Sequence, residues 1–303
     1  MAQVTTAQPS GLVGIWWAAL RPNTLWAGFT PVLVGSALAF ADGGLSILPA
    51  LAALVGAILI QIGTNLFNDY SDFKKGADTE QRIGPARATQ RGWLQPEDVL
   101  LGVKVSLGMA FLVGIFLVYV GGWPIVFLGL ASLACAIAYT GGPFPLAYVG
   151  LGDVFVMAFF GVGAVCGTYY VQTLTVSADA LVASVAVGAL ATAILAVNNL
   201  RDRHTDAVAG KRTLAVRLGS RFTRVQYVLL VVMAFVLPVA WGIGQHRITW
   251  VAVAGAAPMA VFEIRGLVVR DGQALNPHLG GTARLGLVHG VLLSVGMVAE
   301  AWL

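Results

Sequence analysis

Long apolar stretches alternate with short polar ones along almost the whole chain. Nine of the apolar stretches are long enough for a helix that crosses a membrane, which takes about 20 residues. They cover approximately residues 22–41, 47–70, 99–120, 123–140, 150–173, 179–200, 224–244, 248–268 and 283–303. Hydrophobicity is continuous within each stretch, whereas the strands of a membrane barrel alternate apolar and polar residues. The pattern therefore predicts an all-α integral membrane protein, folded as a single transmembrane domain over residues 1–303.

The composition supports the same class of protein. Of the 303 residues, 58% are hydrophobic and 11% are charged, whereas soluble domains carry about 25% charged residues. No nucleic-acid partner is expected for such a chain. Cys135 and Cys166 both lie inside apolar stretches, so we interpret them as small packing residues and expect neither a disulfide nor a metal site from them. Residues 1–15 carry no signal-peptide pattern and are expected to form a flexible leader.

The positive charges fall on one side of the predicted membrane. With nine crossings, all of the 18 Lys and Arg residues except Arg247 lie on the same side. Because cytoplasmic loops carry the excess of Lys and Arg, this side is predicted to be cytoplasmic, in a plasma or inner membrane. The N-terminus is then cytoplasmic, and the C-terminus lies outside. The two longest cytoplasmic loops, about 71–98 and 201–223, are expected to cap the helices.

Acidic motifs stand at the cytoplasmic ends of the second and sixth predicted spans. Residues spaced by about one or two helical turns share one face of a helix. Carboxylates at a membrane boundary are costly and are functional by default. Two such faces turned toward each other would supply oxygen ligands for Mg²⁺, with the remaining ligands coming from phosphate groups. The two sets are Asn65, Asp69 and Asp72, at i, i+4 and i+7, and Asn198, Asp202 and Asp206, at i, i+4 and i+8.

Basic residues follow both acidic helix ends. An allylic diphosphate ionises when the negative charge that develops on its leaving group is neutralised by metal ions and cationic side chains. Arginine can bind phosphate through two parallel hydrogen bonds, and lysine acts as a point charge. An apolar groove between the helices would hold a polyprenyl chain away from water. The basic candidates for substrate binding are Lys74, Arg82, Arg87 and Lys211.

A turn after the fourth predicted span adds two further candidates. The sequence from Tyr139 to Pro143 breaks the chain, and Asp153 lies at the start of the fifth span. One interpretation is structural: a tight cytoplasmic turn, followed by an acidic residue that the helix dipole favours. The other is catalytic, with Tyr139 facing the reacting cation or the aromatic acceptor and Asp153 orienting the acceptor. The sequence leaves both open.

These motifs resemble those of the UbiA superfamily of intramembrane prenyltransferases. The resemblance rests on Asn68-Asp69-x-x-Asp72 and on Asp202-x-x-x-Asp206. Further motifs resemble the branch of that family that prenylates 1,4-dihydroxy-2-naphthoate, and together they extend from residue 21 to about residue 220. They are Arg21-Pro-x-Thr24, Asp72-x-x-Lys75-Gly-x-Asp78, Arg82-Ile-Gly-Pro-x-Arg87, Tyr139-Thr140, Gly150-Leu-Gly-Asp153 and Asn199-Leu-Arg-Asp202, continued by Gly210-Lys211-Arg-Thr-Leu.

The resemblance implies nine helices around a central cavity, Mg²⁺ dependence and a polyprenyl diphosphate donor. It also implies transfer to 1,4-dihydroxy-2-naphthoate with loss of the carboxylate, which yields demethylmenaquinol in menaquinone biosynthesis. The metal ligands it implies are Asp72, Asp202 and Asp206; the catalytic and substrate-binding residues around them are Asp69, Asn65, Asn68, Asn198, Asn199 and Arg21, the last as a candidate for the acceptor's carboxylate. Many members carry a third Asp where this chain has Gly76, and Asp78 is the candidate to replace it.

Three alternatives remain open at this point. A related enzyme could use another acceptor, such as 4-hydroxybenzoate, homogentisate, a tetrapyrrole or a glycerophosphate lipid, although Gly76 and the segment that begins at Arg82 argue against these. An ion-coupled transporter would place its carboxylates near the membrane midplane on broken helices, whereas these lie at one face. A phosphatidyl-group transferase would carry an Asp-Gly-x-x-Ala-Arg motif, which the sequence lacks.

Overall fold

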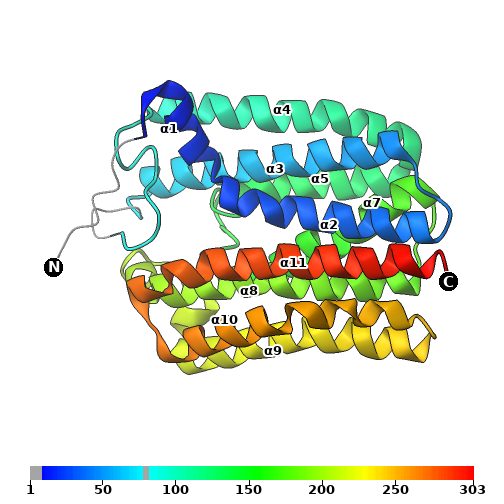
Figure 1. Cartoon of the computed structure of the whole chain (residues 1–303). Helices are drawn as coiled ribbons and strands as arrows, with labels where there is room; N and C mark the ends of the chain where they lie inside the picture. The colour runs from blue at the N-terminus through cyan, green and yellow to red at the C-terminus, as the bar shows by residue number, and fades with distance from the viewer. Residues whose placement is uncertain (1–8, 78–81) are drawn as a thin grey trace.

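The computed structural model describes residues 9–77 and 82–303, and every regular element within these ranges is a helix. The helices lie side by side as an elongated bundle (Figure 1). In chain order they are α1 (Gly11–Leu20), α2 (Pro22–Ala41), α3 (Ile47–Lys74), α4 (Pro96–Gly121), α5 (Trp123–Ala138), α6 (Gly152–Val156), η1 (Met157–Gly163), α7 (Ala164–Thr173), α8 (Ala178–Val208), α9 (Leu214–Gly244), η2 (Ile248–Ala256), α10 (Ala257–Val269), η3 (Gly272–Leu275) and α11 (Asn276–Glu300).

Each predicted span coincides with a helical segment of the described chain. Eight of these segments are long enough and apolar enough to cross a membrane, and α5, with 16 residues, is a shorter apolar helix. Three spans are composite, because α6, η1 and α7 follow one another without a break, as do η2 with α10 and η3 with α11. The predicted all-α integral membrane architecture is therefore confirmed, and the count of nine spans holds only when α5 is included.

The expected leader and loops need correction. Residues 11–15 belong to α1, where Ile15 is buried against the core, so the flexible leader does not extend to residue 15. At the two predicted cap loops, α3 continues to Lys74 and α8 to Val208. The residues at these helix ends are too polar to belong to a membrane span, so hydropathy places the end of each span before them. Their backbone is still helical, because a helix can continue beyond its apolar part.

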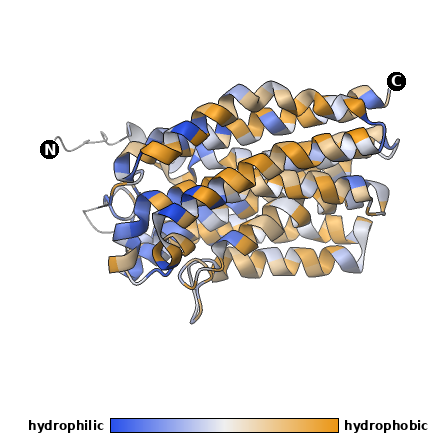
Figure 2. Ribbon diagram, turned by 90° about the horizontal axis from the view of Figure 1, so that it is seen from below, coloured by the Kyte–Doolittle hydropathy of each residue, from blue (hydrophilic) through white to orange (hydrophobic). Residues whose placement is uncertain are grey.

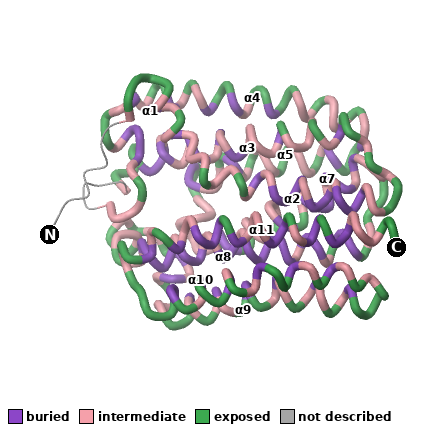
Figure 3. Tube along the Cα trace, in the orientation of Figure 1, coloured by how far each residue is buried: buried purple, intermediate pink, exposed green. Residues whose placement is uncertain are grey.

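The bundle has one polar end and a long apolar shaft. Figure 2 shows hydrophilic residues gathered near α1, at the same end as the loop between α3 and α4, while the shaft is mainly apolar. Burial is uneven across the shaft. Helix α8 is buried along most of its length, whereas many residues of α4 and α9 are exposed (Figure 3). The exposed residues of α4 and α9 include many large apolar ones. Exposed apolar side chains on the outside of such a bundle face lipid, as an integral membrane protein requires.

Packing divides the bundle around α2. Helix α3 packs on α4 at one side, α8 packs on α9 at the other, and α2 contacts both α7 and α11. Close helix approach depends on small residues: in η1, a Cβ added to Gly161 would lie 2.6 Å from the carbonyl oxygen of Ser184 in α8. The π-helical turn of η1 is therefore held directly against α8. The two acidic motifs sit on α3 and α8, on opposite sides of the space that this arrangement encloses.

Candidate active site

A cavity of about 1050 Å³ runs from the polar end of the bundle into its apolar shaft. Residues of α2, α3, α4, α5, α8 and α11 and of the composite helix α6–α7 line it. Its polar end receives charged and amide side chains from segments that are far apart in the sequence, whereas the rest of the wall is apolar. The polar lining residues include Arg21, Thr24, Asn65, Asn68, Asp72, Arg82, Arg87, Asn198, Asn199, Asp202, Asp206, Lys211 and Asn276.

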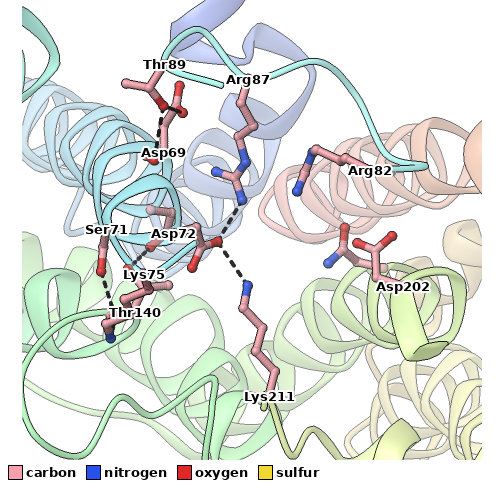
Figure 4. Close-up of polar contacts among 12 residues, drawn as sticks. Asp69, Ser71, Asp72, Lys75, Arg82, Arg87, Thr89, Thr140, Asp202 and Lys211 are labelled. Carbon is pink, nitrogen blue, oxygen red and sulfur yellow. Dashed lines mark hydrogen bonds and ion pairs between the residues drawn. The ribbon is translucent and has the colours of Figure 1, made fainter. Parts of the chain in front are cut away.

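Asp72, at the end of α3, is the most heavily paired carboxylate in the cavity. Its Oδ2 accepts from Nη2 of Arg87 and Nζ of Lys211, both at 3.0 Å, and its Oδ1 accepts from the hydroxyl of Tyr148 at 2.9 Å (Figure 4). The residue is only 1% exposed. A buried carboxylate is stable only when it is paired and hydrogen-bonded. Asp72 therefore gathers two cations from separate loops at one point of the cavity.

Asp69 does not share this surface, and the structure does not bring its carboxylate to the cavity with the other residues of the predicted face. Its carboxylate accepts from the backbone N–H of Ala88 at 3.0 Å and from the hydroxyl of Thr89, and it is absent from the cavity wall. Figure 4 shows it pointing away from Asp72. The face that reaches the cavity is formed by Asn65, Asn68 and Asp72, at i, i+3 and i+7. Asp69 instead fastens the loop before α4 to α3.

Two asparagines on the same face of α3 line the cavity but also hold neighbouring segments. The Nδ2 of Asn65 donates to the carbonyl of Leu20 at 3.1 Å and to Oγ1 of Thr24 at 2.8 Å, so it joins α3 to the junction of α1 and α2. The Oδ1 of Asn68 accepts from the hydroxyl of Thr140 at 2.8 Å. Each amide keeps further hydrogen-bonding capacity toward the cavity.

The acidic end of α8 matches its prediction more closely. Asn198, Asp202 and Asp206 all line the cavity, together with Asn199. They are presented by one helix, as their spacing of about one turn requires. Asp72 of α3 and the carboxylates of α8 thus face the same cavity from opposite walls.

Arg201 organises this end of α8 and was missed by the sequence analysis. Its guanidinium donates to both oxygens of Asp202, at 2.8 and 2.6 Å, and to the Oδ1 atoms of Asn198 at 2.7 Å and Asn276 at 3.1 Å. Asn276 in turn donates to the carbonyl of Ile83 at 3.0 Å. Arg201 was counted among the cations of a cytoplasmic loop, but its side chain is fully buried. The sequence did carry a signal for this role, because Arg201 stands directly before an aspartate in the polar end of a predicted helix.

Tyr148 is the second residue that the sequence analysis missed. Its hydroxyl donates to Asp72, and the ammonium groups of Lys75 and Lys211 lie 4.7 and 4.9 Å from its ring centroid. Lys75 also donates to the carbonyl of Thr140, and burial lowers its pKa from the usual value. Such cation–π contacts hold positive charge near the cavity without neutralising it. Tyr148 lies, like Tyr139, in the connection between α5 and α6, which was the available signal.

Besides Asp69, two predicted residues lie outside the cavity wall. Lys74 is exposed, and its ammonium group lies 5.9 Å from the ring centroid of Tyr70. Asp153 accepts from Nε2 of Gln226 in α9 at 2.8 Å and is not among the lining residues. The structure therefore does not bring these two predicted residues to the cavity with the others. Both were inferred from proximity in sequence, whereas the direction of a side chain depends on its position around the helix.

The remaining predicted residues that the structure describes line the cavity. Arg21 and Arg82 line the cavity, and Nε of Arg82 donates to the carbonyl of Pro85 at 2.9 Å. Tyr139 also lines it, and burial, with a smaller contribution from the carboxylate of Asp153, raises the pKa of Tyr139 above its usual value. Its hydroxyl is therefore neutral at physiological pH and can donate a hydrogen bond. Asp78 lies outside the described residues.

The oxygen donors suit a hard divalent cation that is shared with a substrate. Within residues 9–77 and 82–303, no three His, Cys, Asp or Glu side chains are close enough to hold a metal by themselves. However, Asp72, Asp202 and Asp206 face one cavity, beside the amide groups of Asn68 and Asn198. Mg²⁺ is commonly bound through one or two carboxylates and completed by substrate phosphates and water. The donor set fits that mode of binding.

Comparisons with known proteins bear on this geometry. The model of the UbiA prenyltransferase family matches residues 28–279. A protein of Escherichia coli (strain K12) is 35% identical over 98% of this chain and 99% of its own length, and one of Bacillus subtilis (strain 168) is 32% identical over 97% and 95%. Both relatives are named 1,4-dihydroxy-2-naphthoate octaprenyltransferase.

Solved structures share the fold at low sequence identity. A UbiA homolog from Archaeoglobus fulgidus, bound to DMAPP and Mg²⁺, is 15% identical with a TM-score of 0.65, and the match covers 92% of this chain and 99% of that one. The apo structure of a UbiA homolog from Aeropyrum pernix K1 is 14% identical with a TM-score of 0.67, over 90% of this chain and 98% of that one. These likenesses establish the helical architecture.

Proposed function

This chain belongs to the UbiA prenyltransferase family, and from that premise we propose that it transfers a polyprenyl group from polyprenyl diphosphate to 1,4-dihydroxy-2-naphthoate. The acceptor loses its carboxylate and the product is demethylmenaquinol, an intermediate of menaquinone biosynthesis. The observation that carries the proposal is the cavity: carboxylates and cations meet at its polar end, and an apolar chamber continues into the membrane-spanning shaft. Such a cavity matches a donor with a charged head and a hydrocarbon tail.

The diphosphate binds at the polar end, among the cations. Arg87 and Lys211 both reach Oδ2 of Asp72, and Arg82 lines the same part of the cavity. Charge-assisted hydrogen bonds from Arg and Lys to phosphate oxygens are stronger than neutral ones. These cations come from the loop before α4 and the loop before α9, and both loops are held at α3 through Asp72.

Asp72, Asp202 and Asp206 would hold Mg²⁺, assisted by the amide oxygens of the neighbouring asparagines. When bound, the metal supplies the positive charge that neutralises the departing diphosphate. Asp72 retains acceptor capacity for this role, because each carboxylate oxygen carries two lone pairs and its recorded partners use only part of them. Arg201 holds Asp202 and Asn198 in fixed orientations toward the cavity.

The proposed prenyl transfer needs no strong base. The bond between C1 of the donor and its oxygen breaks, and the electron pair leaves with diphosphate. The carbon of the electron-rich ring that bears the carboxylate forms the new C–C bond; its bond to the carboxylate carbon then breaks, the electrons of that bond restore the aromatic ring, and carbon dioxide departs. Tyr139 takes part as a neutral hydrogen-bond donor, because its raised pKa keeps it protonated. The apolar chamber keeps water from the allylic cation.

The acceptor and the orientation in the membrane complete the proposal. Arg21 lines the cavity and is the cationic partner that we assign to the acceptor's carboxylate. Its backbone is held in a left-handed conformation, with φ of 55°, between α1 and α2. We place the polar end in the cytoplasm, since nearly all Lys and Arg residues lie there, and treat the chain as one transmembrane domain whose C-terminus lies outside.

The test is turnover by the purified protein in lipid nanodiscs. Octaprenyl diphosphate, Mg²⁺ and 1,4-dihydroxy-2-naphthoate should yield the decarboxylated, prenylated product by mass spectrometry, and omission of Mg²⁺ should abolish it. In a parallel panel, 4-hydroxybenzoate and homogentisate should give no product. Preferred prenylation of either of these would reassign the acceptor, and absence of product with every acceptor would overturn the proposed activity.

A further inference from the structure

Gln61 places an amide in the apolar part of the cavity wall. The residue lies in α3, lines the cavity and is only 9% exposed. No residue of the described ranges forms a hydrogen bond with its carboxamide, and neither the oxygen nor the nitrogen of that group is sealed inside the protein. Because the rest of the side chain is buried, the carboxamide is open to the cavity.

Other polar side chains in the apolar wall have partners in their own helices. The hydroxyl of Thr64 donates to the carbonyl of Ile60 at 2.8 Å, and that of Ser132 donates to the carbonyl of Leu128 at 2.7 Å. A buried amide without a partner costs free energy. Water can hydrate Gln61 while the cavity is empty, but substrate that fills the chamber displaces this water. The carboxamide then needs a partner on the substrate.

Gln61 lies too deep in the chamber to reach the diphosphate. Asp72 is eleven residues further along α3, or about 16 Å along the helix axis. Asn65 is one turn, about 6 Å, from Gln61, and it donates to Thr24, three residues after Arg21. Asn65 therefore marks the level of the cation that we assign to the acceptor's carboxylate. A ring that extends from Arg21 into the apolar chamber passes Gln61.

Helix α2 leaves room for a flat ring at this level. It runs beside α3, where a Cβ added to Gly28 would lie 3.6 Å from the carbonyl oxygen of Ala57 and 3.7 Å from Ile58. Ala27 and Gly28 both line the cavity. Since neither carries a bulky side chain, the wall of α2 beside Gln61 does not fill the space in front of the carboxamide.

We propose that Gln61 is a specificity-determining residue that hydrogen-bonds the C4 hydroxyl of the acceptor. The inference rests on the proposed function, because that function supplies the acceptor. The prenyl tail has no polar atom, and the C1 hydroxyl of the acceptor shares its proton with the adjacent carboxylate. The C4 hydroxyl, across the ring, is the polar group left without a partner. The carboxamide can accept its proton through Oε1 or donate to its oxygen through Nε2.

Gln61→Met removes the amide but keeps the length of the side chain and a good helix former. Ser132→Ala, which removes a lining hydroxyl bonded within its own helix, is the matched control. Each variant is compared with two ligands: 1,4-dihydroxy-2-naphthoate as substrate, and 1-hydroxy-2-naphthoate, which lacks only the C4 hydroxyl, as competitive inhibitor. A site built to bind a hydroxyl rejects an analogue without it, because its own polar group is left unpaired.

The wild type should bind the dihydroxy acceptor about tenfold more tightly than the analogue, the scale of one buried hydrogen bond. In Gln61→Met this preference should disappear. KM for the acceptor should rise about tenfold, whereas Ki for the analogue and KM for octaprenyl diphosphate should not rise. Ser132→Ala should keep the wild-type preference. A wild-type preference in Gln61→Met would overturn the proposal.

Thermal unfolding of the ligand-free protein separates this role from simple packing. Replacing an unpartnered buried amide with an apolar group of similar shape is neutral or stabilising, so Tm of Gln61→Met should stay the same or rise. A lower Tm, together with equally weaker binding of both naphthoates, would make Gln61 a packing residue and would overturn the proposal.

Calorimetric titration of the two naphthoates into the protein in nanodiscs repeats the comparison without turnover. If the wild type shows the preference and Gln61→Met loses it, but no product forms with any acceptor, the proposed activity fails and the role of Gln61 stands. If product forms but the wild type binds both naphthoates equally, the role of Gln61 fails and the activity stands. Binding of neither naphthoate, with no product, would overturn both.

Discussion

The two acidic helix ends have similar sequences but different contacts. At the end of α3, only one of two aspartates reaches the cavity, and it is occupied by Arg87, Lys211 and Tyr148; the other, Asp69, holds a loop. At the end of α8, both Asp202 and Asp206 line the cavity, and a fully buried arginine of the same helix orients Asp202. The α3 end thus assembles cations for the diphosphate, and the α8 end presents oxygen ligands. An Asn/Asp motif therefore predicts which residues share a helix face, but it does not predict what each carboxylate contacts or does.

Loss of a carboxylate on α8 should produce the largest effect. Asp202→Asn removes a candidate Mg²⁺ ligand and leaves Arg201 with a neutral partner, so kcat should fall by about 10²–10³-fold, the scale of losing one electrostatic contact to a transition state. Steady-state kinetics over a range of Mg²⁺ concentrations would measure it. Asp98→Asn, an exposed change in the first turn of α4, is the control and should leave kcat unchanged. Wild-type turnover by Asp202→Asn would remove α8 from the metal site.

Arg201→Lys should come next. Lysine keeps the charge but loses the planar fork that contacts both oxygens of Asp202. A change in a residue that positions a metal ligand typically lowers metal affinity or activity by about 10–100-fold. The Mg²⁺ concentration that gives half-maximal activity should therefore rise by about 10–100-fold. Arg203→Lys, at a neighbouring and less buried position, should not change it. An effect on thermal stability alone, with unchanged Mg²⁺ dependence, would make Arg201 purely structural.

Asp69→Asn tests whether Asp69 and Asp72 have different roles at the end of α3. Asparagine keeps one acceptor but loses the charge that binds Ala88 and Thr89. We expect the free energy of unfolding to fall by about 1–3 kcal/mol, the cost of disturbing a buried hydrogen-bonded group, with faster proteolysis of the loop before α4 and a higher KM for the diphosphate. Thr89→Val should reproduce these changes. If Asp69→Asn instead lowers kcat as far as Asp202→Asn does, Asp69 acts in catalysis after all.

Tyr148→Phe should have a modest effect. The change removes one 2.9 Å hydrogen bond to Asp72 but keeps the ring beneath Lys75 and Lys211. Loss of one hydrogen bond is worth about 0.5–1.5 kcal/mol, so KM for the donor should rise by about 2–10-fold with little change in kcat. Tyr148→Leu, which also removes the cation–π contacts, should raise KM further. Equal effects of the two changes would show that the ring does not help to hold the lysines.

Lys74→Ala should have the smallest effect. The side chain is exposed and contacts only the ring of Tyr70 among its recorded partners; exposed charges of this kind contribute at most about 1 kcal/mol. Turnover should stay within about twofold of the wild type. Lys211→Ala, which removes a cation bonded to Asp72, is the contrasting variant and should weaken donor binding strongly. A large loss in Lys74→Ala would restore the residue to the site.

Much of the site could be predicted because it depends on the spacing of residues along a single helix. Spacing along one helix places Asn198, Asp202 and Asp206 on a common face, and all three line the cavity. The same spacing did not predict the contacts of Asp69, because its position around α3 turns its carboxylate to Ala88 and Thr89 of the loop before α4. The contact of Asp153 could not be predicted, because its partner, Gln226, lies 73 residues away on another helix. Arg201 and Tyr148 were missed because topology alone accounts for a basic residue in a loop and a tyrosine in a turn.

The sequence by itself determined the membrane architecture, the placement of positive charge and the candidate diphosphate chemistry, because hydropathy and helical spacing act over a few turns of chain. Only the tertiary structure decided which carboxylates meet and how Arg87 and Lys211 converge on Asp72. Those features depend on contacts between residues that are distant in the chain. The physical reason is that a buried charge takes its partners from whichever segments packing brings within hydrogen-bonding distance.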